Sequence, residues 1–217
     1  MRRRVAVISP TAVVIDQVRE AFNRHWPDGQ CDLLIDEALY SDYADQGQVG
    51  EGTATRIRRL IDLSIDAGAS AVLFAGSVFG AEVVEARSGI NCPVFTSFDA
   101  MIMRAFECGS RLIIQSTAPE SARLLELELR DAAARQGITA DIHRGSLPDA
   151  FEALYGRGDR DLHDRLVAGA VNKLETYDAV LLAQFSMASV RPLLHLATPV
   201  LDPISEAVQR MRMLAGD

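Results

Sequence analysis

Two ten-residue stretches decide the fold: AVLFAGSVFG at residues 71–80 and AVLLAQFSMA at residues 179–188. Each is an apolar run as long as a buried parallel strand, and each breaks into small and polar residues where a helix is expected to begin. In open α/β sheets, ligands bind beside the carboxyl ends of the strands. The two stretches start 108 residues apart (179 minus 71), about half of the 217-residue chain, which indicates an internal repeat.

The repeat extends to the apolar runs on either side. VAVIS at residues 5–9 is followed 107 residues later by LIIQS at 112–116. CPVFTS at 92–97 is followed 106 residues later by TPVLDP at 198–203. Three runs in the same order at nearly constant offset predict an α/β fold with two pseudosymmetric halves, each a parallel sheet of about four strands flanked by helices.

We expect the first half to comprise residues 1–97 with 203–217, and the second half residues 98–202. In this arrangement Gly76 and Gln184 lie at equivalent strand ends, and the active site lies in the cleft between the halves.

Apolar spacing and turn residues predict the remaining elements. Besides the runs already named, strands are expected at residues 31–37 and 140–144. Helices are expected after Pro10 and through Val83, and over residues 53–66, 100–108, 119–136, 149–155, 159–176 and 204–214. Residues 38–52 are predicted to form a long polar loop of the kind that serves as a lid or binding loop. Ser97 is expected to cap the helix over 100–108.

Composition excludes several classes of protein. The chain is 48% hydrophobic and 24% charged, as in ordinary globular proteins, and carries a net charge of −8 with a pI near 5.0. Such a charge argues against nucleic acid as a partner. The apolar run after residue 5 is interrupted by Ser9-Pro10-Thr11 and is unlike a signal peptide, and no segment has the ~20 apolar residues of a membrane span. We therefore expect a cytoplasmic protein with no membrane partner.

Three widely spaced cysteines, Cys31, Cys92 and Cys108, support neither a disulfide framework nor a zinc site. Cys92 begins a predicted strand and Cys108 ends a predicted helix, so both are interpreted as small apolar residues. No metal is predicted.

The stretches AGSVFG and LLAQFSMA, with LIDEALYSD, the FDAM-to-CGSRL junction and GDRDLHD, resemble the aspartate/glutamate racemase superfamily over nearly the whole chain. This superfamily includes hydantoin racemases, maleate isomerases and arylmalonate decarboxylases. The resemblance implies a cofactor-independent isomerase that acts on a small carboxylic acid by proton transfer at the carbon next to the carboxylate. It implies a cysteine after each core strand, and the two thiols act as acid and base on opposite faces of the substrate.

The chain departs from this pattern at both positions, with Gly76 in place of the first cysteine and Gln184 in place of the second. Neither residue is an acid or base near pH 7. Some relatives resemble the chain in having AQ-x-SMA on the second side, whereas arylmalonate decarboxylases keep the second cysteine and have glycine on the first side. Gly76 is either a natural replacement or a deliberate removal of cysteine, and the predicted activity is impaired or altered.

The resemblance also places substrate-binding residues at the strand ends. Position by position, they are Ser9, Thr11, Ser77, Val78, Ser116, Thr117, Phe185 and Ser186. Hydroxyls and backbone N–H groups at helix starts favour a carboxylate, so a small carboxylate is the predicted ligand. The alternative is that these Ser and Thr residues only cap helices.

Other polar residues are weaker candidates. The histidines are interpreted as solvated or structural, with His163 as the main exception, and Asp36 and Glu37 are expected to hold the long loop. A different class of function, a carboxylate-binding protein without turnover, stays open beside an arylmalonate-decarboxylase-like lyase. A homo-oligomer is expected.

Overall fold

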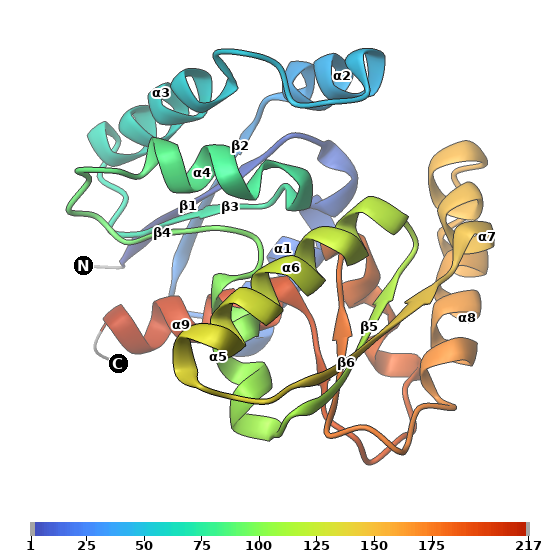
Figure 1. The fold of residues 1–217 in the computed structure, drawn as a ribbon. Helices are drawn as coiled ribbons and strands as arrows, with labels where there is room; N and C mark the ends of the chain where they lie inside the picture. The colour runs from blue at the N-terminus through green and yellow to red at the C-terminus, as the bar shows by residue number, and fades with distance from the viewer. Residues whose placement is uncertain (1–2, 216–217) are drawn as a thin grey trace. The chain divides into compact units, whose positions relative to one another are not determined.

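The computed structural model describes residues 3–215 and divides the chain into two compact units. Unit 1 runs to Ala100 and takes in the chain from Ala207 onward, and unit 2 is Met101–Glu206. The two divisions fall inside helices, α5 at Asp99–Cys108 and α9 at Pro203–Ala215. Each unit contains one four-stranded sheet (Figure 1).

Unit 1 is built on a sheet in which every pairing is parallel. The strand order is β2-β1-β3-β4, so β1 and β3 are the central strands. The strands are β1 Arg4–Ser9, β2 Gln30–Ile35, β3 Val72–Phe74 and β4 Val94–Phe95. The helices are η1 Ala12–Val14, α1 Ile15–His25, α2 Glu37–Gln46, α3 Thr53–Asp66, η2 Ser77–Phe79 and α4 Gly80–Ala86. Helices α3 and α4 lie side by side over the sheet (Figure 1).

Unit 2 repeats this topology, with parallel strands in the order β6-β5-β7-β8. The strands are β5 Arg111–Ser116, β6 Asp141–Ser146, β7 Ala179–Leu182 and β8 Val200–Leu201. The helices are α6 Pro119–Gln136, α7 Pro148–Phe151, the π-helix η3 Glu152–Gly156, α8 Arg160–Val171 and η4 Phe185–Leu193. The predicted α/β fold with two parallel four-stranded sheets flanked by helices is confirmed.

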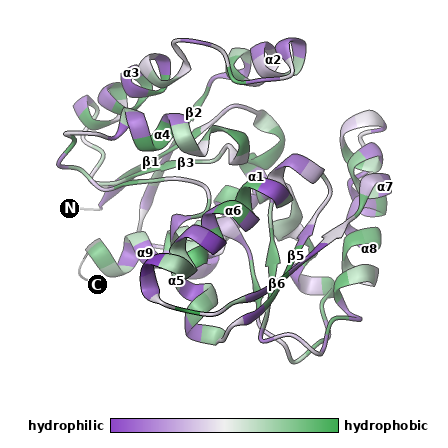
Figure 2. Ribbon diagram, viewed as in Figure 1, coloured by the Kyte–Doolittle hydropathy of each residue, from purple (hydrophilic) through white to green (hydrophobic). Residues whose placement is uncertain are grey.

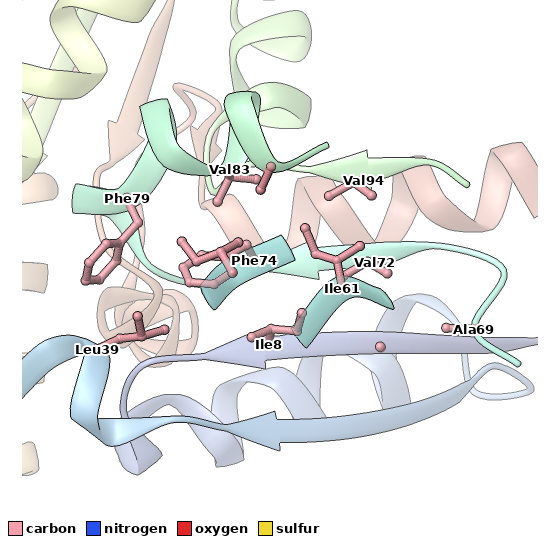
Figure 3. Packing of buried hydrophobic residues seen from close by; sticks show 12 residues of the cluster. Ile8, Leu39, Ile61, Ala69, Val72, Phe74, Phe79, Val83 and Val94 are labelled. Atoms are coloured by element: carbon pink, nitrogen blue, oxygen red, sulfur yellow. The ribbon is translucent and has the colours of Figure 1, made fainter. Parts of the chain in front are cut away.

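The core of unit 1 shows why β3 is entirely apolar. Val72 and Phe74 are fully buried, and Ile61 of α3 and Val83 of α4 belong to the same hydrophobic cluster (Figure 3). Leu73, between them on the strand, is also fully buried. Both faces of the strand are therefore covered, as is usual for the central strands of α/β sheets.

Helix α3 illustrates how sequence spacing selects a buried face. Ile57 and Ile61, one helical turn apart, are fully buried, whereas Leu63 is 56% exposed. Several helices accordingly show both hydrophilic (purple) and hydrophobic (green) residues along their length in Figure 2. Gly68, with a positive φ of 91°, follows the helix and lets the chain turn towards β3.

The prediction of a loop over residues 38–52 is wrong for most of its length, because α2 occupies Glu37–Gln46. Leu39 and Tyr43, four residues apart, form the apolar face of this helix: Leu39 is buried, and the Tyr43 ring packs edge-on against Phe79. Gly47 ends the helix in the left-handed conformation, with φ of 66°. The turn into α3 is left with six residues, 47–52.

The predicted capping role of Ser97 is also wrong. Its hydroxyl donates to the carbonyl of Phe74 at 3.0 Å, so it ties the end of β3 to the segment after β4. The preceding Thr96 caps α5 instead, because its Oγ1 accepts from the N–H groups of Phe98 and Asp99. Asp99 in turn accepts from the Thr96 N–H at 2.9 Å, which gives a reciprocal cap.

Other differences concern boundaries. The helix expected over 159–176 ends at Val171, because residues 172–177 turn towards β7. The helix expected over 149–155 is α7 followed by the π-helix. Within residues 3–215, no helix has both the length and the apolar character needed to cross a membrane.

Two substitutions on α3 test this account of the core. Replacing the buried Ile61 with alanine is expected to lower the free energy of unfolding by about 2–5 kcal/mol, because a cavity remains. The same change at the exposed Leu63 is expected to alter it by less than about 0.5 kcal/mol. Urea denaturation of both variants measures the difference, and equal effects would contradict the assigned face.

Candidate functional site

The hydroxyl groups in the turn after β1 form hydrogen bonds with the backbone of the same turn. Ser9 Oγ donates to the carbonyl of Thr11 at 2.8 Å and accepts from the Thr11 N–H at 3.3 Å. Thr11 Oγ1 accepts from the Val13 N–H at 3.0 Å and caps η1. The hydroxyls of Ser9 and Thr11 thus make turn and cap hydrogen bonds, and the binding role of these two residues stays a prediction.

Position 76 follows β3, and neighbouring side chains occupy the space where a side chain at this position would lie. Gly76 has extended backbone, with φ of −145°. A Cβ at this position would lie 2.8 Å from Phe74 Cε1, 2.9 Å from Pro10 Cγ and 3.0 Å from Phe79 Cδ2. These separations are shorter than van der Waals contact, and the rings of Phe74 and Phe79 pack edge to face at 5.9 Å. A cysteine therefore does not fit at residue 76 unless these rings move.

The two residues after Gly76 form the start of η2. Ser77 is half-buried, and Val78 is partly buried against the hydrophobic cluster of unit 1. Val78 therefore contributes to packing.

The equivalent turn in unit 2 is organised by Gln184, which follows β7. Its Oε1 accepts from Thr117 N at 2.7 Å, Thr117 Oγ1 at 2.8 Å and Ala118 N at 3.2 Å, and we call these three donors the donor cluster. Ser116 Oγ lies 3.1 Å from the same oxygen, but its single hydrogen is donated to the carbonyl of Ala118 at 2.7 Å. Gln184 is only 8% exposed. The structure thus brings together three of the predicted site residues of unit 2, Ser116, Thr117 and Gln184.

The remaining predicted residues of unit 2 are buried at the start of η4. Phe185 is 4% exposed and belongs to the core, and Ser186 is 1% exposed. Ser186 Oγ has no hydrogen-bond partner among the described residues. The carbonyl of Ser186 accepts from Arg160 Nη1 at 3.3 Å.

His163 on α8 belongs to a buried polar network. Its Nδ1 lies 2.6 Å from Asp164 Oδ1, which also accepts from Ser189 Oγ at 2.8 Å. His163 is fully buried, and its Nε2 has no partner within residues 3–215. The network ties α8 to η4, the segment that follows Gln184.

Asp202 and Glu206 are ionisable residues after β8 that the sequence analysis missed. Asp202 is fully buried, lies 2.7 Å from Arg191 Nε and accepts from the Ser205 N–H at 2.8 Å. The 106-residue offset is the signal that could have found Asp202, because it aligns Asp202 with the capping residue Thr96. Burial, and then the charge of Asp202, raises the pKa of Glu206 to about 7, against lowering effects of Arg191 and Arg104.

The cysteines do not supply a reactive thiolate. Burial, and then the charge of Asp32, raises the pKa of Cys31 to about 12. Burial is also the main cause that raises the pKa values of Cys92 and Cys108. All three are therefore neutral thiols near pH 7. Among residues 3–215, no group of three or more His, Cys, Asp or Glu side chains could hold a metal ion.

Unit 1 contains a cavity of about 150 Å³ beneath the segment that the sequence marked as a binding loop. Its wall includes Tyr43 of α2, Arg56 of α3, the turn at residues 50–52, and Phe79. The Arg56 guanidinium pairs with both oxygens of Asp36, at 2.7 and 2.8 Å. Asp36 thus connects the start of α2 to α3, where the sequence predicted that it holds the long loop, and its charge is paired with that of Arg56.

Comparison with known proteins identifies relatives over the whole fold. A family model described as Asp/Glu/Hydantoin racemase matches residues 5–211. No curated protein sequence matches the chain.

Solved structures of three racemases are similar to the chain. The allantoin racemase from Klebsiella pneumoniae is 20% identical, with a TM-score of 0.65 over 98% of this chain and 87% of that chain. The aspartate racemase of Picrophilus torridus is 15% identical, with a TM-score of 0.68 over 96% and 94%. The glutamate racemase from Francisella tularensis, solved in complex with D-glutamate, is 12% identical, with a TM-score of 0.63 over 98% and 81%. At these identities the likeness establishes the fold.

Because neighbouring side chains fill the space beside Gly76, any side chain introduced there is expected to lower the free energy of unfolding. Gly76→Ala is expected to lower the free energy of unfolding by about 1–3 kcal/mol, because the new methyl group overpacks the site. Gly169, exposed on α8 with open space where a Cβ would lie, provides the control: Gly169→Ala is expected to stabilise by about 0.5–1 kcal/mol. Denaturant unfolding measures both, and a neutral Gly76→Ala would contradict the packing.

The raised pKa of Glu206 predicts how stability depends on pH. The ordinary pKa of a glutamate is 4.5, and that of Glu206 in the folded chain is about 7. Between these two pH values the unfolded chain has lost the Glu206 proton while the folded chain retains it, so folding stability falls as pH rises. Glu206→Gln removes this loss. We expect it to exceed the parent in stability by on the order of 2 kcal/mol at pH 8, with the gain disappearing near pH 4.5.

Thermal or urea denaturation at pH 4.5, 6 and 8 measures this difference. The exposed Glu175→Gln is the control and is expected to change stability little across the range. A Glu206→Gln variant that is less stable than the parent at pH 8 would contradict the burial argument.

Proposed function

The chain belongs to the Asp/Glu/Hydantoin racemase family, and from this premise we propose that it acts without a cofactor on a small carboxylic acid. The reaction is proton transfer at the carbon next to the carboxylate. It is impaired or altered relative to racemisation by two thiols, because Gly76 and Gln184 stand at the two thiol positions.

The donor cluster of unit 2 is the observation that carries the ligand class. Three donors within 3.2 Å of a single oxygen form a site suited to a carboxylate oxygen, at the N-terminus of the 18-residue helix α6. The ligand of the Francisella racemase, D-glutamate, is itself a small carboxylate. The donor cluster and this comparison together support a small carboxylate as the ligand of this chain, with the residues of the donor cluster as part of its binding site.

The missing thiols restrict the chemistry. Racemisation requires one group to remove a proton from one face and another to return a proton to the opposite face. Glycine does neither, and a carboxamide does not ionise near pH 7. The chain as written therefore lacks the acid–base pair for racemisation by thiols, and any proton transfer that it catalyses is slow or involves one face only.

A second candidate is a carboxylate-binding protein without turnover. The packing around Gly76 favours it, because that position leaves no room for a reactive side chain. An arylmalonate-decarboxylase-like lyase is the third possibility, since those relatives combine a first-side glycine with a second-side cysteine.

Position 184 provides the sharpest test. Gln184→Cys places a thiol beside the donor cluster, whose N–H groups favour a thiolate, without disturbing the packing around Gly76. Gln184→Ser is the matched control with a hydroxyl. Deuterium incorporation in heavy water is measured by NMR for amino acids, maleate and arylmalonates, together with loss of carbon dioxide from the arylmalonates.

We expect at least one small carboxylate to raise the melting temperature of the parent in a concentration-dependent way. We expect Gln184→Cys to exceed both parent and Gln184→Ser in proton exchange or decarboxylation by at least about 100-fold, the range of one general acid or base. Stabilisation with no turnover in any variant would favour the binding protein. If no compound stabilises the parent and no variant shows turnover, the proposal is wrong.

A further inference from the structure

Three buried polar atoms of unit 2 have no hydrogen-bond partner within the part of the chain that the structure describes. They are Oε1 of Gln115, Nε2 of His163 and Oγ of Ser186. The exposed fractions of these residues are 5%, 0% and 1%. Each buried polar atom without a partner costs free energy of folding, so three of them in one unit require a physical explanation.

The topology places Gln115 and His163 in the same layer of unit 2. Helix α8 connects β6 to β7 and therefore crosses β5, which lies between these strands. Ile113 of β5 and Val167 of α8 belong to one hydrophobic cluster. Gln115 lies two residues beyond Ile113 on the same face of the sheet, and His163 lies one helical turn before Val167 on the buried face of α8. Because α8 runs opposite to the parallel strands, both residues extend this cluster towards the carboxyl ends of the strands.

Ser186 adjoins the same end of α8. Its carbonyl accepts from Nη1 of Arg160, the first residue of α8, at 3.3 Å. Ser189, three residues further along η4, donates from its hydroxyl to Asp164 Oδ1 at 2.8 Å. The residues with the three unpartnered atoms therefore gather where α8 begins.

Unit 1 has apolar residues at the three corresponding positions, which offsets of 107, 106 and 108 residues identify as Ile8, Ile57 and Val78. Helix α3 crosses β1 in unit 1 as α8 crosses β5 in unit 2. Ile8 and Ile57 are fully buried in one hydrophobic cluster, and Val78 packs against that cluster (Figure 3). The three positions are therefore neighbours in this topology, and apolar side chains are sufficient for its packing. The polar residues of unit 2 are not required by the fold.

Asp164 determines what His163 can bind. Its Oδ1 lies 2.6 Å from Nδ1 of His163, and a carboxylate at this distance keeps the hydrogen of the neutral ring on Nδ1. Nε2 then presents a lone pair and accepts a hydrogen bond. The carboxamide oxygen of Gln115 is a second acceptor, and the hydroxyl of Ser186 donates as well as accepts. A primary amide matches this set, because it offers two N–H donors and one carbonyl acceptor.

We propose that Gln115, His163 and Ser186 form a polar binding site in unit 2 for a small molecule or group with a primary amide. The two acceptors receive the N–H groups of the amide, and the Ser186 hydroxyl donates to its carbonyl. This site differs from the donor cluster, which offers N–H and hydroxyl donors to an oxygen. The inference goes beyond the proposed function, since it requires neither a carboxylate nor a proton transfer.

A pair of probes of similar shape tests the site. Acetamide has the N–H donors, whereas acetone has a carbonyl group and no N–H. Binding to the parent is followed by ¹⁵N NMR of the histidine rings, with the His163 signals assigned by their loss in His163→Gln. His143, an exposed histidine whose Nε2 lies 2.8 Å from Asp141, is the internal control.

We expect acetamide to move the Nε2 signal of His163 and to bind at least about tenfold more tightly than acetone, because only acetamide donates to the two acceptors. The His143 signals are expected to stay in place with both probes. If acetamide leaves the His163 signal unchanged, or if the two probes bind equally, the three atoms are served by bound water only and the proposal is wrong.

Substitutions at the site provide the second test. Ser186→Ala and Gln115→Met each remove one proposed contact and are expected to reduce the preference for acetamide over acetone to less than about threefold. Without a probe, Ser186→Ala is expected to melt at or above the temperature of the parent, because it removes a buried hydroxyl that has no partner.

Ser189→Ala is the matched control on η4. It removes a hydroxyl that donates to Asp164, so its melting temperature is expected to fall below that of the parent. A Ser186→Ala variant that loses as much stability as Ser189→Ala would show that the Ser186 hydroxyl serves the fold, and would overturn the inference.

Discussion

Parallel pairing of the central strands determines what each strand end can touch. In unit 1 the N–H of Ala75 donates to the carbonyl of Ile8, and in unit 2 the N–H of Ala183 donates to the carbonyl of Gln115. These two backbone bonds bring residues 76 and 184 beside the turns that follow β1 and β5. The same backbone pairing therefore leads to two different local chemistries. Apolar side chains of Pro10, Phe74 and Phe79 occupy the space beside Gly76, whereas Gln184 makes polar contacts with Thr117.

Much of the fold could be predicted from the sequence because buried parallel strands leave a strong apolar signal. The runs containing β1, β3, β5 and β7 and their near-constant offset were sufficient for the two sheets. Helix α2 was missed because only Leu39 and Tyr43 mark its buried face among many polar residues. The capping role of Ser97 was misjudged because its hydroxyl bonds to the end of β3, a contact between distant parts of the chain.

The candidate site was predictable as a set of positions, but its hydrogen bonds were not. Ser116, Thr117 and Gln184 do meet, whereas Ser9 and Thr11 serve their own turn. The clash at residue 76 could not be foreseen, because it depends on side-chain rotamers of Phe74 and Phe79. Asp202 was overlooked because the 106-residue offset was applied only to the apolar runs and not to the polar residue that follows them. Glu206 has no such signal, and its raised pKa follows from burial in the folded chain.

The rings around Gly76 also bear on how this chain could change over generations. Since Phe74, Pro10 and Phe79 already fill the volume of a side chain, a single codon change at residue 76 introduces a thiol only together with a steric conflict. A side chain fits at residue 76 only if the rings of Phe74 and Phe79 move or a smaller residue replaces one of the three neighbours. Substitutions at residue 76 and at its three neighbours are therefore coupled, because a side chain added at one position needs space given up at another.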